Sequence, residues 1–219
     1  MQLETMNEVW TIDDRLEPTE FVGFAEDRFP LELAVRVLET FSSPGDTVLD
    51  PFVGLGTTFA AGSQTGRKVI GIEVNPERVA HLHRTFAPPH MVIASRVQDV
   101  EVASLPPVSL LYCSPPYPTV HLRDDPWGST YFEDMRDIFQ RLATRVRPDG
   151  HMVIEVSNVR TKDGFRPLVA QFTQLLGEVF IQTAEIIRTH NSDWPAGPGV
   201  NWSAMLVFTP NPPKTHRHE

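Results

Sequence analysis

The chain has 219 residues, which fits one α/β domain and leaves little room for a second. Hydrophobic residues make up 41% of it, enough for an ordinary core, and no apolar run approaches the roughly 20 residues of a membrane span. The formal net charge of -9 argues against a general nucleic-acid binder, because such proteins use Lys and Arg to displace counterions from phosphates. The single cysteine, Cys113, excludes an internal disulfide framework and the common cysteine-rich zinc sites, and we assign no metal. The first residues lack the features of a signal peptide, so we expect a cytoplasmic protein.

In chain order, the sequence predicts a polar N-terminal arm over residues 1–28 and then a helix, in which apolar residues recur at helical spacing over 31–41. Strands are expected at 47–49, 68–74, 91–94, 108–113 and 151–156, and further helices at 57–64, 76–86, 131–146 and 167–176. This alternation predicts an α/β fold with a doubly wound, mostly parallel sheet. Residues 180–188 and 203–208 are expected to add an antiparallel hairpin, giving seven strands in one domain over 29–209 before a disordered tail at 210–219.

The first strand leads into a glycine-containing turn with the sequence Asp50-Pro51-Phe52-Val53-Gly54-Leu55-Gly56-Thr57-Thr58. Gly54 and Gly56 allow the backbone to approach a ligand closely, and the helix that begins near Thr57 offers unpaired N–H groups to the same space. Glu73 ends the second strand, where a carboxylate can accept bonds from ribose hydroxyls. In open α/β sheets, ligands bind beyond the carboxyl ends of the strands, so these residues predict a nucleoside cofactor site.

The turn is not a dinucleotide fingerprint, since it lacks the third glycine of that motif and carries a carboxylate that would repel a pyrophosphate. A cationic ligand without phosphate fits better, and S-adenosylmethionine is such a ligand. We expect Asp50 near its ammonium group, Glu73 at its ribose and Asp99 near its adenine amine, although Asp99 is equally well explained as a helix cap or a solvated loop acid.

The fourth strand ends in a second motif, Ser114-Pro115-Pro116-Tyr117. Two prolines remove two N–H donors and fix the backbone, which leaves a rigid ribbon of carbonyl acceptors beside the Ser114 hydroxyl. Such acceptors suit a substrate amine, and they stabilise the positive charge that develops on its nitrogen during attack. Tyr117 can stack on a nucleobase that has been flipped out of a duplex. Cys113 is expected to be a small core residue and not a nucleophile.

Together, these motifs resemble those of the DNA amino-methyltransferases, which make N4-methylcytosine or N6-methyladenine. The glycine turn is similar to their S-adenosylmethionine motif, residues 71–76 to their acidic motif, and Ser114–Tyr117 to their catalytic motif. Phe29 and Pro30 resemble the segment that closes over the methionine part of the cofactor. The resemblance spans about residues 29–156 and implies a Rossmann-like class I methyltransferase fold, with S-adenosylmethionine as cofactor and DNA methylation, as in restriction-modification, as activity.

The sequence departs from the family pattern in two ways that bear on how a target would be recognised. The cofactor motif precedes the catalytic motif, which matches one permutation group of the family, and no segment is long enough for a target-recognition domain. Recognition is therefore expected from residues 118–130, from 188–201, from a homodimer or from a separate subunit. Ser at the first catalytic position favours cytosine N4 over adenine N6, and DNA is favoured over RNA. An adenine enzyme, an RNA base methyltransferase and a catalytically silent nucleic-acid-binding subunit remain the alternatives.

Several cationic and aromatic residues lie in loops near the predicted strand ends. For each, phosphate or base contact and a solvated or packed loop position are both open interpretations. They are Arg123, Arg160, Lys162, Arg166, Arg188, Trp127, Trp194 and Trp202.

Overall fold

The structure, a computed structural model, describes residues 8–13, 15–16, 28–118, 128–161, 164–190 and 202–210. Its centre is an eight-stranded sheet with the order β1-β9-β10-β6-β5-β2-β3-β4. The strands are β1 (Val9–Ile12), β2 (Thr47–Asp50), β3 (Lys68–Glu73), β4 (Met91–Ala94), β5 (Val108–Cys113), β6 (Val146–Val156), β9 (Ile181–His190) and β10 (Trp202–Thr209). This confirms the predicted doubly wound, mostly parallel sheet, with one more strand than expected.

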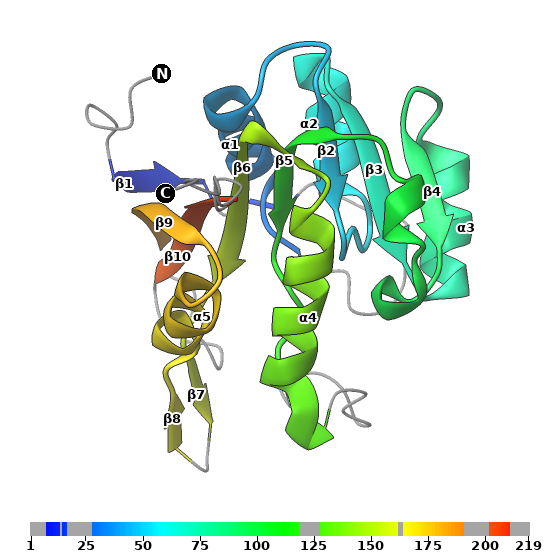
Figure 1. The fold of residues 1–219 in the computed structure, drawn as a ribbon. Helices are drawn as coiled ribbons and strands as arrows, with labels where there is room; N and C mark the ends of the chain where they lie inside the picture. Colours follow the sequence, from blue (N-terminus) through cyan, green and yellow to red (C-terminus); the bar gives the residue numbers. More distant parts are fainter. Residues whose placement is uncertain are drawn as a thin grey trace, which may run out of the picture.

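Helices cover both faces of the sheet, as Figure 1 shows. They are α1 (Leu31–Phe41), α2 (Thr57–Thr65), α3 (Pro76–Thr85), α4 (Tyr131–Ala143) and α5 (Leu168–Gly177). One core joins α4 and α5 to the sheet through residues such as Phe139 and Phe172. The other core joins α1, α2 and α3 to the opposite face through residues such as Leu38, Phe59 and Leu82. The strand order reverses between β2 and β5, which places a ligand crevice at their carboxyl ends.

The C-terminal hairpin is confirmed, since β10 pairs antiparallel with both β9 and β6. The extra strand, β1, lies in the predicted arm and pairs parallel with β9, with Trp10 opposite Arg188. Its residues alternate between exposed and buried, and the guanidinium of Arg36 lies 4.4 Å from the centre of the Trp10 ring. The sequence does not predict a strand in the arm, because its four residues stand in an acidic stretch, far in sequence from β9.

Two further differences concern β6 and the segment after it. The strand begins at Val146 and runs through Gly150, where a Cβ would lie 2.7 Å from the Ser109 carbonyl oxygen, so only glycine allows the close pairing with β5. After β6 comes a separate small hairpin of β7 (Val159–Thr161) and β8 (Gly164–Arg166), which projects from the body in Figure 1.

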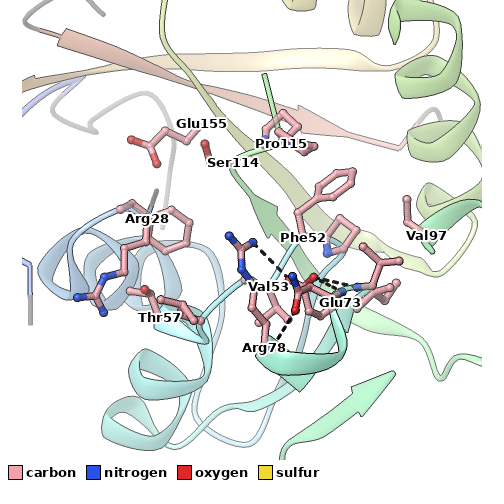
Figure 2. Close-up of a pocket in the computed structure, with 18 of the residues that line it drawn as sticks. Arg28, Phe52, Val53, Thr57, Glu73, Arg78, Val97, Ser114, Pro115 and Glu155 are labelled. Carbon is pink, nitrogen blue, oxygen red and sulfur yellow. Dashed lines mark hydrogen bonds and ion pairs between the residues drawn. The ribbon is translucent and has the colours of Figure 1, made fainter. Parts of the chain in front are cut away.

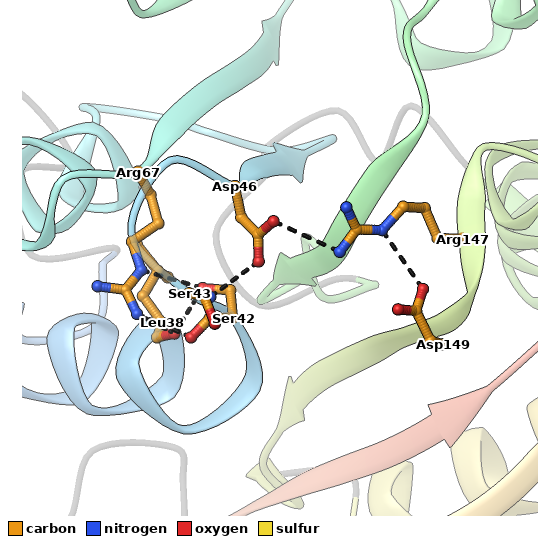
Figure 3. A network of polar contacts seen from close by, with 7 residues as sticks. All are labelled: Leu38, Ser42, Ser43, Asp46, Arg67, Arg147 and Asp149. Atoms are coloured by element: carbon orange, nitrogen blue, oxygen red, sulfur yellow. Dashed lines mark hydrogen bonds and ion pairs between the residues drawn. The ribbon is translucent and has the colours of Figure 1, made fainter. Parts of the chain in front are cut away.

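The amino end of the sheet is closed by a network of polar contacts, shown in Figure 3. Arg67 donates to the carbonyl oxygen of Ser42 at 2.8 Å and to the Ser42 hydroxyl at 3.2 Å, which ties β3 to the end of α1. Arg147 lies 3.4 Å from carboxylate oxygens of both Asp46 and Asp149. These contacts lie at the opposite end of the strands from the crevice, so we assign them to the fold. Among the residues placed by the structure, no helix has the length and apolar character needed to span a bilayer.

Candidate active site

A cavity of about 800 Å³ opens at the carboxyl edge of the sheet, over β2, β3, β5 and β6. That volume lies within the range of small-molecule sites, about 300–1,000 Å³. Figure 2 shows the cavity with Glu73 and Arg78 toward one end and Ser114, Pro115 and Glu155 toward the other. The two predicted motifs therefore meet in one space. Its lining includes Phe29, Pro51, Phe52, Gly54, Thr57, Glu73, Ser114, Pro115, Pro116 and Tyr117 from the predicted set.

The two glycines of the turn have different roles. Gly54 has φ of +55° and lines the cavity, and a Cβ there would clash with nothing, since its nearest neighbour would be the Phe52 carbonyl oxygen at 3.9 Å. Gly56 also has positive φ, at +88°, but it lies outside the lining, and a Cβ there would come within 2.5 Å of the Phe86 ring and 2.7 Å of Leu82. Gly54 thus fits the predicted close approach to a ligand, whereas Gly56 allows α3 to pack on the turn.

Asp50 is buried beneath the turn and does not line the cavity. Its carboxylate accepts a 2.5 Å bond from the Thr58 hydroxyl and a 3.0 Å bond from the Phe52 N–H. Burial raises the pKa of Asp50 to about 7, and the two hydrogen bonds oppose that rise. Asp50 and Thr58 brace the turn from below. This geometry therefore does not favour the expected position of Asp50 beside a cofactor ammonium.

Glu73 lies at the cavity wall, as the sequence predicted, and it is only 7% exposed. Its Oε1 accepts bonds from the N–H groups of Val74 and Asn75 at 2.9 and 2.8 Å. Its Oε2 lies 3.9 Å from Nη1 of Arg78, one turn into α3. The Asn75 side chain caps that helix by accepting from the N–H groups of Glu77 and Arg78. The two backbone N–H groups hold Oε1 of Glu73 and leave its Oε2 as the acceptor available to a ligand hydroxyl.

The loop after β4 lines the cavity with residues that precede Asp99, the residue expected there. Ser95, Arg96, Val97 and Gln98 line it, whereas Asp99 does not. Asp99 closes a short 3-10 turn over Val97–Asp99, in which its N–H donates to the Arg96 carbonyl at 3.0 Å. The structure therefore favours the interpretation of Asp99 as a loop acid, and Ser95, Arg96 and Gln98 are polar residues at this wall.

The motif Ser114–Tyr117 forms the other end of the cavity. The Pro116 carbonyl accepts a 2.9 Å bond from the Tyr131 hydroxyl, which fixes the ribbon against the first turn of α4. The Tyr117 hydroxyl accepts a 2.7 Å bond from the Ser157 N–H, and its ring packs on the core. Burial raises the pKa of Tyr117 to about 12, so the hydroxyl stays protonated at neutral pH. Tyr117 thus presents a fixed aromatic ring with a protonated hydroxyl. Cys113 is fully buried, as expected of a core residue.

Other predicted residues fall beside the cavity or outside the described chain. Phe29 lines it, with its ring centre 5.0 Å from that of Tyr112, while Pro30 is the N-cap of α1 and lies outside the lining. Trp202 begins β10 and packs against the core. The structure does not describe Arg123, Lys162, Trp127 and Trp194, nor most of the two loops expected to recognise a target.

Sequence reasoning missed a buried ion pair in the cavity wall. Glu155 and Arg188 both line the cavity, each with a side chain 6% exposed, and Arg188 Nη1 lies 2.7 Å from Glu155 Oε1. The signal was present in β6, where an acid interrupts the otherwise apolar run Met152–Val156, since a buried charge needs a partner. Arg28, Asn75 and Arg78 also line the cavity and were not predicted.

Residues 2–84 match the model of a family described as DNA methylase. This chain is 39% identical over 71 residues to type II methyltransferase M.Cfr9I of Citrobacter freundii, a match that covers 32% of this chain and 22% of that protein. It is 50% identical over 50 residues to DNA adenine methyltransferase YhdJ of Escherichia coli, a match that covers 23% of this chain and 17% of that protein. The matched stretches thus span about a fifth of the length of these relatives.

Solved structures share the fold over most of the chain. TrmN from Thermus thermophilus superposes with a TM-score of 0.60 at 15% identity, over 82% of this chain and 48% of that one. A methyltransferase from Pyrococcus furiosus gives 0.58 at 15% identity, over 89% and 87%. At such identities the likeness shows the Rossmann-like class I methyltransferase fold and nothing finer.

Proposed function

We propose, from the relationship of residues 2–84 to the DNA amino-methyltransferases, that this chain transfers a methyl group to the exocyclic amine of a flipped nucleobase. The proposed target is N4 of cytosine in DNA, and the proposed cofactor is S-adenosylmethionine. The observation that carries this proposal is that one cavity holds both the turn at Gly54 with Glu73 and the motif Ser114–Tyr117.

The residues at the Glu73 end fit a nucleoside. We assign Glu73 Oε2 to ribose hydroxyls, since it lines the cavity, and Phe52 and Val97 supply apolar walls for a planar ring. Gln98 is the polar side chain that would meet an adenine edge. Gly54 and Thr57 border the space left for the methionine part, with Phe29 beside them. When bound, S-adenosylmethionine supplies an electrophilic methyl group on a sulfonium, and no phosphate site is required.

The residues at the other end fit an amine. The lone pair of a cytosine or adenine amine is delocalised into the ring, so the nitrogen is a poor nucleophile. Acceptors out of the plane of the base, here Ser114 Oγ and the Pro115 carbonyl, favour a pyramidal nitrogen with a localised lone pair. They also stabilise the positive charge on that nitrogen in the transition state. The fixed ring of Tyr117 gives the base a surface on which to stack.

The choice of cytosine rests on Ser114, since serine at this position leans toward N4-cytosine enzymes in the family. The relatives do not separate the two bases, because one of them is named as an adenine enzyme. The choice of DNA rests on the family match and on the β7–β8 hairpin, which follows β6 at the carboxyl edge and presents the exposed side chains Arg160, Phe165 and Arg166. In a chain of net charge -9, this local basic element is the surface we assign to phosphates. A homodimer or a separate subunit would supply further recognition.

The base and the polymer are tested by nucleoside mass spectrometry after incubation with S-adenosylmethionine and either duplex DNA or RNA. We expect N4-methylcytosine in the DNA sample. N6-methyladenine alone would overturn the choice of base, and methylated RNA beside unmethylated DNA would overturn the choice of polymer. A chain that binds the cofactor yet methylates neither, with or without a partner, would be the silent binding subunit.

A further inference from the structure

A row of polar side chains extends from Ser114 across the sheet, away from the Glu73 end. Cys113, the last residue of β5, is paired in parallel register with Ile154 of β6, so extending that register by one residue brings Ser114 next to Glu155, and both line the cavity. Strands lie about 4.8 Å apart in a sheet, and side chains at matching positions stand side by side. Figure 2 shows Ser114 and Glu155 at the same end of the cavity, away from Glu73.

The row continues through β10 and β9. Ser203 of β10 is paired with Arg188 of β9, and both reach back to Glu155. Arg188 Nη1 donates to Glu155 Oε1 at 2.7 Å, and the Ser203 hydroxyl donates to the same oxygen at 3.0 Å. Both bonds end on Oε1. Within the described residues, no hydrogen bond ends on Oε2, although Glu155 is only 4% exposed and lines the cavity.

The substrate amine needs a proton acceptor such as a carboxylate. A methylated amine carries a positive charge until it loses a proton, and the Ser114 hydroxyl and Pro115 carbonyl are too weakly basic to keep that proton. In this chain the first position of the catalytic motif is serine and not a carboxylate, so the motif itself supplies no proton acceptor. Glu155 is the carboxylate that the register places beside it.

We propose that Glu155 is a catalytic residue of this site, a second acceptor for the substrate amine that receives the proton lost on methylation; this rests on the proposed function. The amine nitrogen forms a bond to the methyl carbon with its lone pair as the carbon–sulfur bond breaks, and that electron pair stays on the sulfur. The nitrogen then loses one proton to Glu155 Oε2, and the N–H electron pair returns to the nitrogen. The neutral N-methyl base leaves, and Glu155 releases the proton to water.

Arg188 and Ser203 are positioning residues for this step. By holding Oε1, they fix the carboxylate and leave Oε2 without a hydrogen-bond donor among the described residues. A buried carboxylate without such partners would be strongly destabilised. The same ion pair explains why Arg188 faces inward. The sequence had suggested either a phosphate contact or a solvated loop position for this residue.

The test is single-turnover methyl transfer by Glu155→Gln with labelled S-adenosylmethionine and DNA. Glutamine keeps the size of the side chain and one acceptor but cannot hold the proton. We expect the transfer rate to fall by about 100-fold or more, as for loss of a general base, while the dissociation constant for S-adenosylmethionine stays within about threefold. A merely structural role would move both together. Glu185→Gln is the matched control, an acid-to-amide change on β9 outside the cavity lining, and it should retain the wild-type rate.

If Glu155→Gln fails to fold, the double variant with Arg188→Gln restores a neutral hydrogen-bonded pair and should show the same selective loss. Wild-type transfer rates in a folded Glu155→Gln, or in that double variant, would overturn the inference and leave the proposed function intact. Absence of transfer by the wild-type chain to any nucleic acid would overturn both.

Discussion

Gly54 and Gly56 stand two residues apart with positive φ, yet the structure gives them separable roles. Gly54→Ala places a methyl group at the cavity wall, and the left-handed backbone strain costs on the order of 1 kcal/mol. We expect the affinity for S-adenosylmethionine to fall at least tenfold with a small loss of stability. Gly56→Ala adds the same strain and a clash with Phe86, so its loss of stability should be larger, on the order of 2–4 kcal/mol.

Calorimetric titration and urea unfolding of both variants measure this contrast. The wild-type chain is the reference for both the affinity and the unfolding free energy. Equal effects of the two substitutions on affinity and on stability would contradict the division between a ligand-facing glycine and a packing glycine.

Asp50 gives a pH dependence whose sign is set by its burial. Its pKa, raised to about 7, means that the folded chain holds a proton more tightly than the unfolded chain does. Stability should therefore decrease as pH rises from about 4 to about 7, by on the order of a few kcal/mol. Asp50→Asn removes this titration, so the unfolding free energy of wild type minus that of Asp50→Asn should decline over the window. Urea unfolding at several pH values measures the difference, and a flat difference would show that Asp50 does not titrate there.

At the scale of elements, the β7–β8 hairpin is the addition that sequence patterns did not predict. Its two strands have three residues each, too few for a periodic signal, and Arg160 lies over the Phe165 ring at 5.5 Å. It is anchored by Val159, which is buried, and by Asn158, whose side chain accepts from the Val169 N–H of α5. The hairpin is thus a short exposed ribbon with a fixed base, which follows β6 in the chain.

We predict that the hairpin contacts phosphates. Replacing Arg160 and Arg166 together by Ala should weaken DNA binding at all sequences and lower the slope of log affinity against log salt concentration by about 1–2. Arg84→Ala, which removes an exposed charge in the last turn of α3, is the control and should leave the slope unchanged. Fluorescence anisotropy across a salt series measures this slope. An unchanged slope in the double variant would show that DNA binds at a surface other than the hairpin.

Local patterns predicted the strands and helices around the cavity, because apolar periodicity, proline and glycine act over a few residues. They also predicted Glu73 and the motif Ser114–Tyr117 at the site, since both come directly after strands or end them. They could not predict the pairing of β1 with β9, whose partners are 178 residues apart at Val9 and Ile187. Nor could these patterns show that Asp50 is buried under the turn while Glu73 lines the cavity. That difference in position arises only when α2 packs on β2.

At the scale of the whole molecule, the sheet order explains why two distant motifs form one site. β2 carries the glycine turn and β5 the proline motif, and these strands are neighbours at the point where the strand order reverses. β3 brings Glu73 to one end of the cavity, and β6 brings Glu155 to the other. The net charge of -9 fits the proposal that target choice depends on small basic elements or on a partner.

In the proposed function, a methyl group moves in this cavity from S-adenosylmethionine to a base amine. The most direct measurement is transfer of a tritiated methyl group from S-adenosylmethionine to duplex DNA by the wild-type chain, followed by digestion and separation of nucleosides. We predict label in N4-methylcytosine that depends on Ser114, with Ser114→Ala binding the cofactor but losing most transfer. Label that stays in the cofactor with DNA and RNA alike, or transfer that survives Ser114→Ala unchanged, would contradict it.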